Sequence, residues 1–173
     1  MHVVIFCGGY GTRLGALTRD RPKYLVPIAG RPFADLQLDL LTSQGFDEFT
    51  FCIGYLGNQI RAHLDYHWHD LDMQFYSDDG LGGPWDAYRR LPRSIRRSRH
   101  ATIYGDSYLP LTPAEVNGWY WQTLGVQVHL RWKGEDYGMR FKPGKTTRRV
   151  QAPSRYYEVG SVAGIKELEA YLS

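Results

Sequence analysis

The sequence of 173 residues contains only two cysteines and has no strong excess of either charge. Cys7 and Cys52 each lie in a strand-like apolar stretch, so we expect core residues and neither a disulfide framework nor a metal pair. No apolar run approaches the ~18 residues that a membrane helix needs. No basic segment followed by an apolar stretch opens the chain, so we expect no secretory signal. These absences favour a cytoplasmic protein with no membrane partner.

The formal net charge is +3, but the basic residues are unevenly distributed. Arg89, Arg90, Arg93, Arg96, Arg97 and Arg99 fall within eleven positions. Nucleic-acid surfaces interleave such cations with aromatic side chains, whereas these arginines alternate mainly with Pro, Ser and Ile. We therefore expect a solvated helix face and loop, with an anionic partner or an interface as the alternative, and no nucleic-acid binding.

Several well-known site patterns are missing as well. His63 and His67 have the spacing of a paired metal ligand, but the H-E-x-x-H pattern is absent, which favours a polar helix end. The glycine-rich stretch 8–13 lacks the Gly-Lys-Ser/Thr ending of a P-loop and the third glycine of the dinucleotide fingerprint. Neither of these two nucleotide-binding motifs therefore describes the stretch.

A glycine-rich turn directly follows the first apolar run, His2–Cys7, which predicts a buried strand. Glycines allow positive φ and let backbone N–H groups approach an oxyanion. Thr12 adds a hydroxyl, Arg13 a planar guanidinium suited to phosphate, and Lys23 a second cation. This combination predicts phosphate binding, and a turn that only packs is the alternative interpretation.

Hydrophobic patterning predicts alternating strands and helices, and therefore an α/β protein with a parallel sheet and right-handed crossovers. In such sheets ligands bind beyond the carboxyl ends of the strands, where the glycine-rich turn would lie. Thr112-Pro113-Ala114-Glu115 has the pattern of a capped helix start. The other expected helices are 32–44, 58–69 and 165–172, and the expected strands after the first are 48–54, 72–76, 101–105, 126–132 and 156–160.

Asp106 follows the strand expected over residues 101–105. A carboxylate at this end of a sheet, beside a phosphate loop, is well placed for Mg²⁺, which prefers oxygen ligands and bound phosphates. An aspartate that only forms a turn is the alternative.

The spacing G-G-x-G-T-R-L, followed by Pro22-Lys23, Pro27 and Gly30-Arg31-Pro32, resembles the sugar-phosphate nucleotidyltransferases. Within that family the sequence most resembles the bacterial heptose and mannose 1-phosphate guanylyltransferase-like members. The resemblance implies a Rossmann-like three-layer αβα sandwich with a mostly parallel, mixed sheet, the glycosyltransferase-A-like fold. It also implies a single domain over residues 1–173.

The resemblance further implies a magnesium-dependent transfer of a nucleoside monophosphate from a nucleoside triphosphate to a sugar 1-phosphate, releasing pyrophosphate. Arg13, Lys23 and Asp106 would be catalytic, and Asp106 with Glu158 would hold Mg²⁺. Pro84 and Trp85 depart from the family's small-residue run, so Trp85 would either stack on the base or fill its space. The residues expected to bind the nucleotide are Gly8, Gly9, Gly11, Thr12, Arg13, Gly82 and Gly83.

The C-terminal part matches the family less fully. Tyr157-Glu158-Val159-Gly160-Ser161 resembles the family's closing segment, with Glu158 in place of the more usual Asp. The link from Val150 to Ser154 is short, so we expect a shortened sugar-binding half, either as a trimmed variant or because a segment is missing from this chain. An inactive nucleotide- or sugar-binding domain of the same fold is the alternative function, and a homo-oligomer is a further expectation.

Overall fold

The fold is built around one large sheet that carries helices on both faces. The computed structural model describes residues 1–77, 82–121, 126–133, 135–142 and 146–173. The elements in chain order are β1 (His2–Phe6), η1 (Thr12–Thr18), η2 (Lys23–Leu25), β2 (Pro27–Ile28), β3 (Arg31–Pro32), α1 (Phe33–Ser43), β4 (Glu48–Ile53), α2 (Gly57–His67), β5 (Asp72–Ser77), α3 (Pro84–Arg90), α4 (Arg93–Arg97), β6 (His100–Tyr104), β7 (Ser107–Tyr108), α5 (Pro113–Trp121), β8 (Val126–Trp132), β9 (Glu135–Lys142), β10 (Thr146–Gln151), β11 (Tyr157–Glu158) and α6 (Val162–Leu172).

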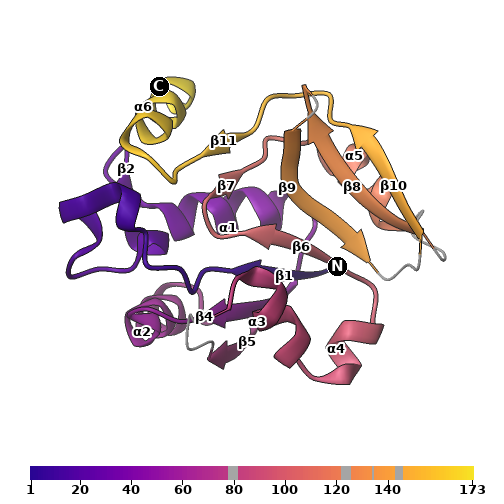
Figure 1. Ribbon diagram of the computed structural model, residues 1–173, viewed down its shortest axis with the longest axis horizontal. Coiled ribbons are helices and arrows are strands. Elements are labelled where there is room, and N and C mark those ends of the chain that lie inside the picture. Colours follow the sequence, from indigo (N-terminus) through magenta and orange to yellow (C-terminus); the bar gives the residue numbers. More distant parts are fainter. Residues whose placement is uncertain (78–81, 122–125, 134, 143–145) are drawn as a thin grey trace.

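The large sheet has the strand order β10-β8-β9-β6-β1-β4-β5 (Figure 1). The central strand β1 pairs in parallel with β4 and with β6, and β5 continues the parallel pairing beyond β4. Strand β9 runs antiparallel to both β6 and β8, so the sheet is mixed but mostly parallel. The predicted fold class is confirmed, and the carboxyl ends of β1, β4 and β6 meet at one edge.

Alternate side chains of β1 face two separate apolar layers, because successive residues of a strand point to opposite faces. Val3 and Ile5 belong to a large cluster to which α1, α2, α5 and α6 contribute. Val4 belongs to a smaller cluster with residues of α3 and α4, among them Leu91 and Ile95. Helices therefore cover both faces of the sheet, which gives the expected three layers.

The predicted helices are present because their local signals are strong. Helix α1 ends just before Gly45, whose φ of 93° suits the left-handed turn that commonly follows a helix. At the start of α5, Glu115 accepts hydrogen bonds of 2.8 Å from the backbone N–H and the hydroxyl of Thr112. The Glu115 N–H donates back to the Thr112 hydroxyl over 3.3 Å, which completes the predicted capping box.

The arginine-rich stretch has the solvated helix face that the sequence predicts, whereas the start of the last helix differs from the prediction. The arginine-rich stretch forms the short helices α3 and α4, with buried Leu91 and Ile95 facing the sheet. Helix α6 begins at Val162, earlier than predicted, because the Ser161 hydroxyl caps it by accepting from the Gly164 N–H over 3.2 Å. In the described part of the chain, no helix has the length and apolar character needed to cross a membrane.

Candidate active site

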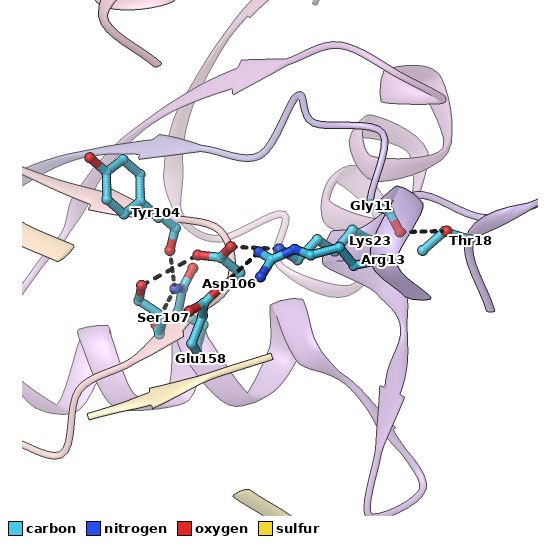
Figure 2. A network of polar contacts seen from close by, with 9 residues as sticks. Gly11, Arg13, Thr18, Lys23, Tyr104, Asp106, Ser107 and Glu158 are labelled. Atoms are coloured by element: carbon cyan, nitrogen blue, oxygen red, sulfur yellow. Dashed lines mark hydrogen bonds and ion pairs between the residues drawn. The ribbon is translucent and has the colours of Figure 1, made fainter. Parts of the chain in front are cut away.

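The glycine-rich turn leaves β1 at the edge where the parallel strands end. Gly11 has φ of 66° and begins η1, and a Cβ at this position would approach the side chains of Thr18 and Lys23 too closely. The Thr18 hydroxyl donates to the Gly11 carbonyl over 3.0 Å, which fixes the turn (Figure 2). A glycine is therefore required at position 11 by both φ and space.

The turn presents backbone donors that the protein itself does not use. The N–H groups of Gly8, Gly9, Tyr10 and Gly11 donate to no acceptor among the residues that the structure describes. An added Cβ at Gly9 would have nothing within 4 Å, so space is open in front of this residue. Adjacent N–H groups at an open turn are a favourable binding arrangement for an anion.

Lys23 and Asp106 form a sheltered ion pair beside this turn. Lys23 Nζ lies 2.5 Å from Asp106 Oδ2, and the two side chains are 15% and 23% exposed. Gln37 of α1 holds the turn that carries Asp106, because its Nε2 donates to the carbonyls of Tyr104 and Ser107 over 3.0 and 2.7 Å. The position of Asp106 is thus set by the buried helix α1 as well as by β6.

Arg13 and Glu158 form a second, more open pair at the same place. Arg13 Nη2 lies 2.9 Å from Glu158 Oε1, with side-chain exposures of 65% and 41%. Figure 2 shows Arg13, Lys23, Asp106 and Glu158 converging on one point. The two pairs bring together four charged residues that are far apart in the sequence.

The short ladder of β7 and β11 brings Glu158 to this point. Glu158 pairs with Ser107 across the ladder, and the Val159 N–H donates to the Asp106 carbonyl over 2.8 Å. A Cβ at Gly160 would clash with the Glu158 carboxylate and the Arg13 guanidinium, and it would come within 3.2 Å of Lys23 Nζ. Gly160 is therefore a site residue that was not singled out as such from the sequence, although its motif was noted.

A pocket of about 190 Å³ lies against the turn and the first ion pair. Its wall contains four of the expected nucleotide-binding glycines, whereas Gly11, Thr12, Arg13 and Glu158 are not part of it. Gly11 instead shapes the turn, while Thr12 and Arg13 are exposed. The lining residues are Phe6, Cys7, Gly8, Gly9, Lys23, Tyr24, Cys52, Gly82, Gly83, Pro84, Ala87, Tyr104, Gly105 and Asp106.

Trp85 is not among the residues that line this pocket, so it does not fill that space, and stacking on a bound base stays a prediction. The side chain packs against β9, where Lys142 Nζ and Arg140 Cζ lie 4.3 and 4.6 Å from the centre of its ring. Its neighbours on α3, Pro84 and Ala87, line the pocket in its place. The departure from the family's small-residue run therefore leaves the pocket open.

The donor set at the ion pairs suits Mg²⁺ in its chemistry. Asp106 and Glu158 supply carboxylate oxygens, and Mg²⁺ is commonly held by one or two carboxylates together with substrate phosphates. Among the described residues, no group of three or more His, Cys, Asp or Glu side chains could hold a metal ion. The remaining ligands would therefore have to come from a bound phosphate and water.

His63 has a packing role between two helices. Its Nε2 lies 2.8 Å from Asp35 Oδ1, which also accepts from Trp68 Nε1 over 2.8 Å. The ring of His67 lies 4.5 Å from that of His63, centre to centre. These contacts join α2 to the first turn of α1, and none of these residues lines the pocket.

A family model and several curated proteins match part of this chain. The family model of the MobA-like NTP transferase domain matches residues 3–113. A D-glycero-alpha-D-manno-heptose 1-phosphate guanylyltransferase of Campylobacter jejuni is 23% identical over 111 residues, which is 64% of this chain and 50% of the relative. A glucose-1-phosphate cytidylyltransferase of Salmonella typhimurium is 35% identical over 77 residues, 44% of this chain and 30% of the relative. The chain spans half or less of the length of these curated relatives.

Solved structures share the fold along the whole chain. HddC from Yersinia pseudotuberculosis, complexed with GMP-PN, aligns with a TM-score of 0.80 at 17% identity and covers 99% of both chains. CTP:phosphocholine cytidylyltransferase from Streptococcus pneumoniae aligns with a TM-score of 0.70 at 16% identity, again over 99% of both chains. At these identities the likeness shows a common fold.

Proposed function

This chain belongs to the family of MobA-like NTP transferase domains, and we propose that it transfers a nucleoside monophosphate from a nucleoside triphosphate to a sugar 1-phosphate. The products are a nucleoside diphosphate sugar and pyrophosphate. The sugar 1-phosphate is proposed because relatives such as the heptose 1-phosphate guanylyltransferase and the glucose-1-phosphate cytidylyltransferase are named for such acceptors. The buried thiols of Cys7 and Cys52 suit a reducing cytoplasm.

The convergence of two ion pairs at the mouth of a glycine-lined pocket carries this proposal. Lys23 pairs with Asp106, and Arg13 pairs with Glu158. A metal-bound triphosphate offers each of the four side chains an opposite charge, since its phosphates attract the cations and its metal attracts the carboxylates. The site is therefore suited to exchange internal pairs for contacts with a magnesium nucleotide.

Each residue then has a defined task in an in-line displacement. A sugar 1-phosphate oxygen attacks the α-phosphorus, and the bond to pyrophosphate breaks. Because the nucleophile is already an anion near neutral pH, no general base is needed, and alignment and charge stabilisation lower the barrier. The amides of Gly8–Thr12 cradle the triphosphate, Lys23 sits near the α-phosphate, and Arg13 neutralises the departing pyrophosphate.

The base is held at the other end of the pocket. Gly82 and Gly83 let the backbone lie close to the base, beside Pro84 and Ala87. Asp106 and Glu158 would hold Mg²⁺, which when bound neutralises phosphate charge. Neither carboxylate has to act as a base in this scheme, which leaves both of them available to the metal.

The test of this proposal begins with thermal-shift screening of the four common nucleoside triphosphates with Mg²⁺. A ligand that binds the native state raises the melting temperature, so the preferred base is the one with the largest shift. Pyrophosphate release is then measured with that triphosphate and a panel of sugar 1-phosphates. We expect release that depends on both substrates, whereas binding without any release would favour the inactive binding domain.

A matched pair of variants links this activity to the site. Arg13→Ala removes one preorganised charge and should lower kcat by about 10²–10³ with the fold intact. Arg21→Ala removes an exposed arginine outside the described pocket lining and serves as the control. Wild-type turnover in Arg13→Ala would remove Arg13 from the proposed machinery.

A further inference from the structure

Helix α3 presents two neighbouring sides to two different parts of the molecule. Pro84 and Ala87, three residues apart, line the pocket. Trp85 and Tyr88 each follow one of these residues by one position. They therefore lie about 100° further around the helix axis, where they face β9. Whatever holds the second side in place therefore also sets the position of the pocket wall.

Arg140 lies over the Trp85 ring and His100 meets the Tyr88 hydroxyl, but the ammonium of Lys142 is the group that contacts both rings. Lys142 Nζ lies 4.3 Å from the centre of the Trp85 ring and 4.0 Å from that of Tyr88. The strand register places Lys142 beside His100, on the face that α3 covers. Lys142 is only 7% exposed, and in the described part of the chain no carboxylate pairs with it. Its charge is thus stabilised mainly by two aromatic faces.

Among the groups that surround it, Lys142 is the residue whose charge changes close to neutral pH. Burial, and then the positive charge of Arg140, lower the pKa of Lys142 to about 8. His100 lies beside it on β6, and burial lowers the pKa of His100 to about 4, so this imidazole is neutral. Its Nδ1 faces the Ser98 carbonyl at 3.0 Å and must donate, so Nε2 accepts from the Tyr88 hydroxyl at 3.1 Å.

We propose that Lys142 is a positioning residue for nucleotide binding, because its ammonium, held by the rings of Trp85 and Tyr88, fixes α3 and with it the base side of the pocket. This inference rests on the proposed function and adds a residue to it that touches no substrate. Loss of the ammonium leaves the triphosphate contacts in place and loosens the wall formed by Pro84 and Ala87. Nucleotide affinity should then fall while the chemical step keeps its rate.

The first test compares the charge at position 142 with a matched lysine. Lys142→Met removes the ammonium and should raise Kd and KM for the preferred triphosphate by roughly two- to tenfold, the range of one or two cation–π contacts, with kcat within about twofold. Lys142→Arg keeps a cation and should restore affinity. The control is Lys133→Met, since Lys133 also lies over a tryptophan ring, 4.6 Å from the centre of Trp132, but is exposed and remote from α3. Melting temperatures report whether each variant is folded.

The second test follows affinity against pH. Wild-type affinity should fall as pH rises through about 8, where Lys142 loses its proton. The fall should be absent in Lys142→Arg, whose guanidinium stays charged, and in Lys142→Met, which should bind weakly throughout. The nucleotide's own titration is common to all three proteins and cancels in the comparison.

A further variant covers the case in which substitutions at position 142 unfold the protein. Trp85→Leu removes one ring of the contact at a residue that is already 37% exposed, and it should weaken nucleotide binding to the same extent. Wild-type affinity in Lys142→Met or Trp85→Leu, or an unchanged pH profile in Lys142→Arg, would overturn the role of Lys142 alone. A wild-type protein that binds no triphosphate would overturn the proposed function and this inference together.

Discussion

The two faces of the central sheet differ in what they bury. The face covered by α1, α2, α5 and α6 is almost wholly apolar, and Phe33, Phe49 and Phe51 are 1% exposed or less. The face covered by α3 and α4 has a small apolar cluster and buries polar groups that include His100 and Lys142. Apolar burial is insensitive to protonation, whereas buried titratable groups are not. We infer that the first face supplies most of the stability and the second makes it depend on pH.

The polar face remains buried because its groups find partners. His2 Nε2 lies 2.8 Å from the Thr50 hydroxyl, and the His2 N–H donates to the Tyr120 hydroxyl over 3.0 Å. A buried polar group without a partner costs roughly 1–3 kcal/mol, so such a network tolerates little change. We therefore expect substitutions at neighbouring residues of one strand to cause different losses in the free energy of unfolding.

The largest expected effect compares Phe51 and Thr50, which point to opposite faces from adjacent positions of β4. Phe51→Ala leaves a cavity beside Tyr24 and Phe75 and should lower the free energy of unfolding by about 3–5 kcal/mol at every pH. Thr50→Val keeps the side-chain shape but removes the hydrogen-bond partner of His2. This substitution should lower the free energy of unfolding by about 1–3 kcal/mol. Urea unfolding at several pH values measures both. A strongly pH-dependent loss of unfolding free energy in Phe51→Ala would contradict the difference inferred between the two faces.

The next effect is acid destabilisation by His100. Its pKa is about 4 in the folded protein and 6.5 when unperturbed, so the unfolded state binds the proton more readily between these values. The contribution of His100 is therefore complete above pH 6.5 and is lost as pH falls towards 4, by up to about 3 kcal/mol. In His100→Asn, which keeps a donor for the Ser98 carbonyl, the pH slope of unfolding in this window should be shallower than in the wild type. Equal slopes in the two proteins would remove His100 from the explanation.

An effect of the same kind and of similar size is expected at alkaline pH from Lys142. Its folded pKa of about 8 lies below the ordinary value of 10.5, so the unfolded state holds more protons in between. Stability should therefore rise as pH increases from 8 to 10.5, by up to about 3 kcal/mol relative to Lys142→Met. Nucleotide affinity should instead fall as pH rises through about 8, where the folded protein loses the Lys142 charge that positions α3. A parallel rise of both quantities would contradict the role given to this lysine.

The smallest expected effect lies outside both polar clusters, at the start of α5. Thr112→Ala breaks the capping box and should lower the free energy of unfolding by about 1 kcal/mol with no change in its pH dependence. Thr112→Ser keeps the hydroxyl oxygen and is the matched control. Chemical denaturation of both variants at pH 5 and pH 7 would show a pH-dependent difference if this helix end were linked to the polar face.

Local signals in the sequence predicted the parallel part of the fold and much of the site. The apolar run 2–7, the helix stop at Gly45 and the capping box at Thr112 are encoded within a few residues each, so periodicity and turn chemistry were sufficient. The spacing of Arg13 and Lys23 after the first strand likewise marked the turn that we propose to bind phosphate. These features depend on neighbours in the chain.

The features that were missed depend on contacts between distant segments. Insertion of β9 between β6 and β8 is a long-range pairing, and no local pattern specifies it. The direction of Trp85 is set by Arg140 and Lys142, which are more than fifty positions away. The close approach of Gly160 to the charged ends of Arg13, Lys23 and Glu158 arises only once these side chains are brought together.

The measurement that tests the central claim most directly is a calorimetric titration with a non-hydrolysable triphosphate of the preferred base, with and without Mg²⁺. The account predicts that Mg²⁺ tightens binding to the wild type by roughly 5- to 150-fold, the usual range of coupling between two ligands, and has little effect on Asp106→Asn. A wild type that binds equally well without the ion, or a variant that keeps the full magnesium effect, would contradict it.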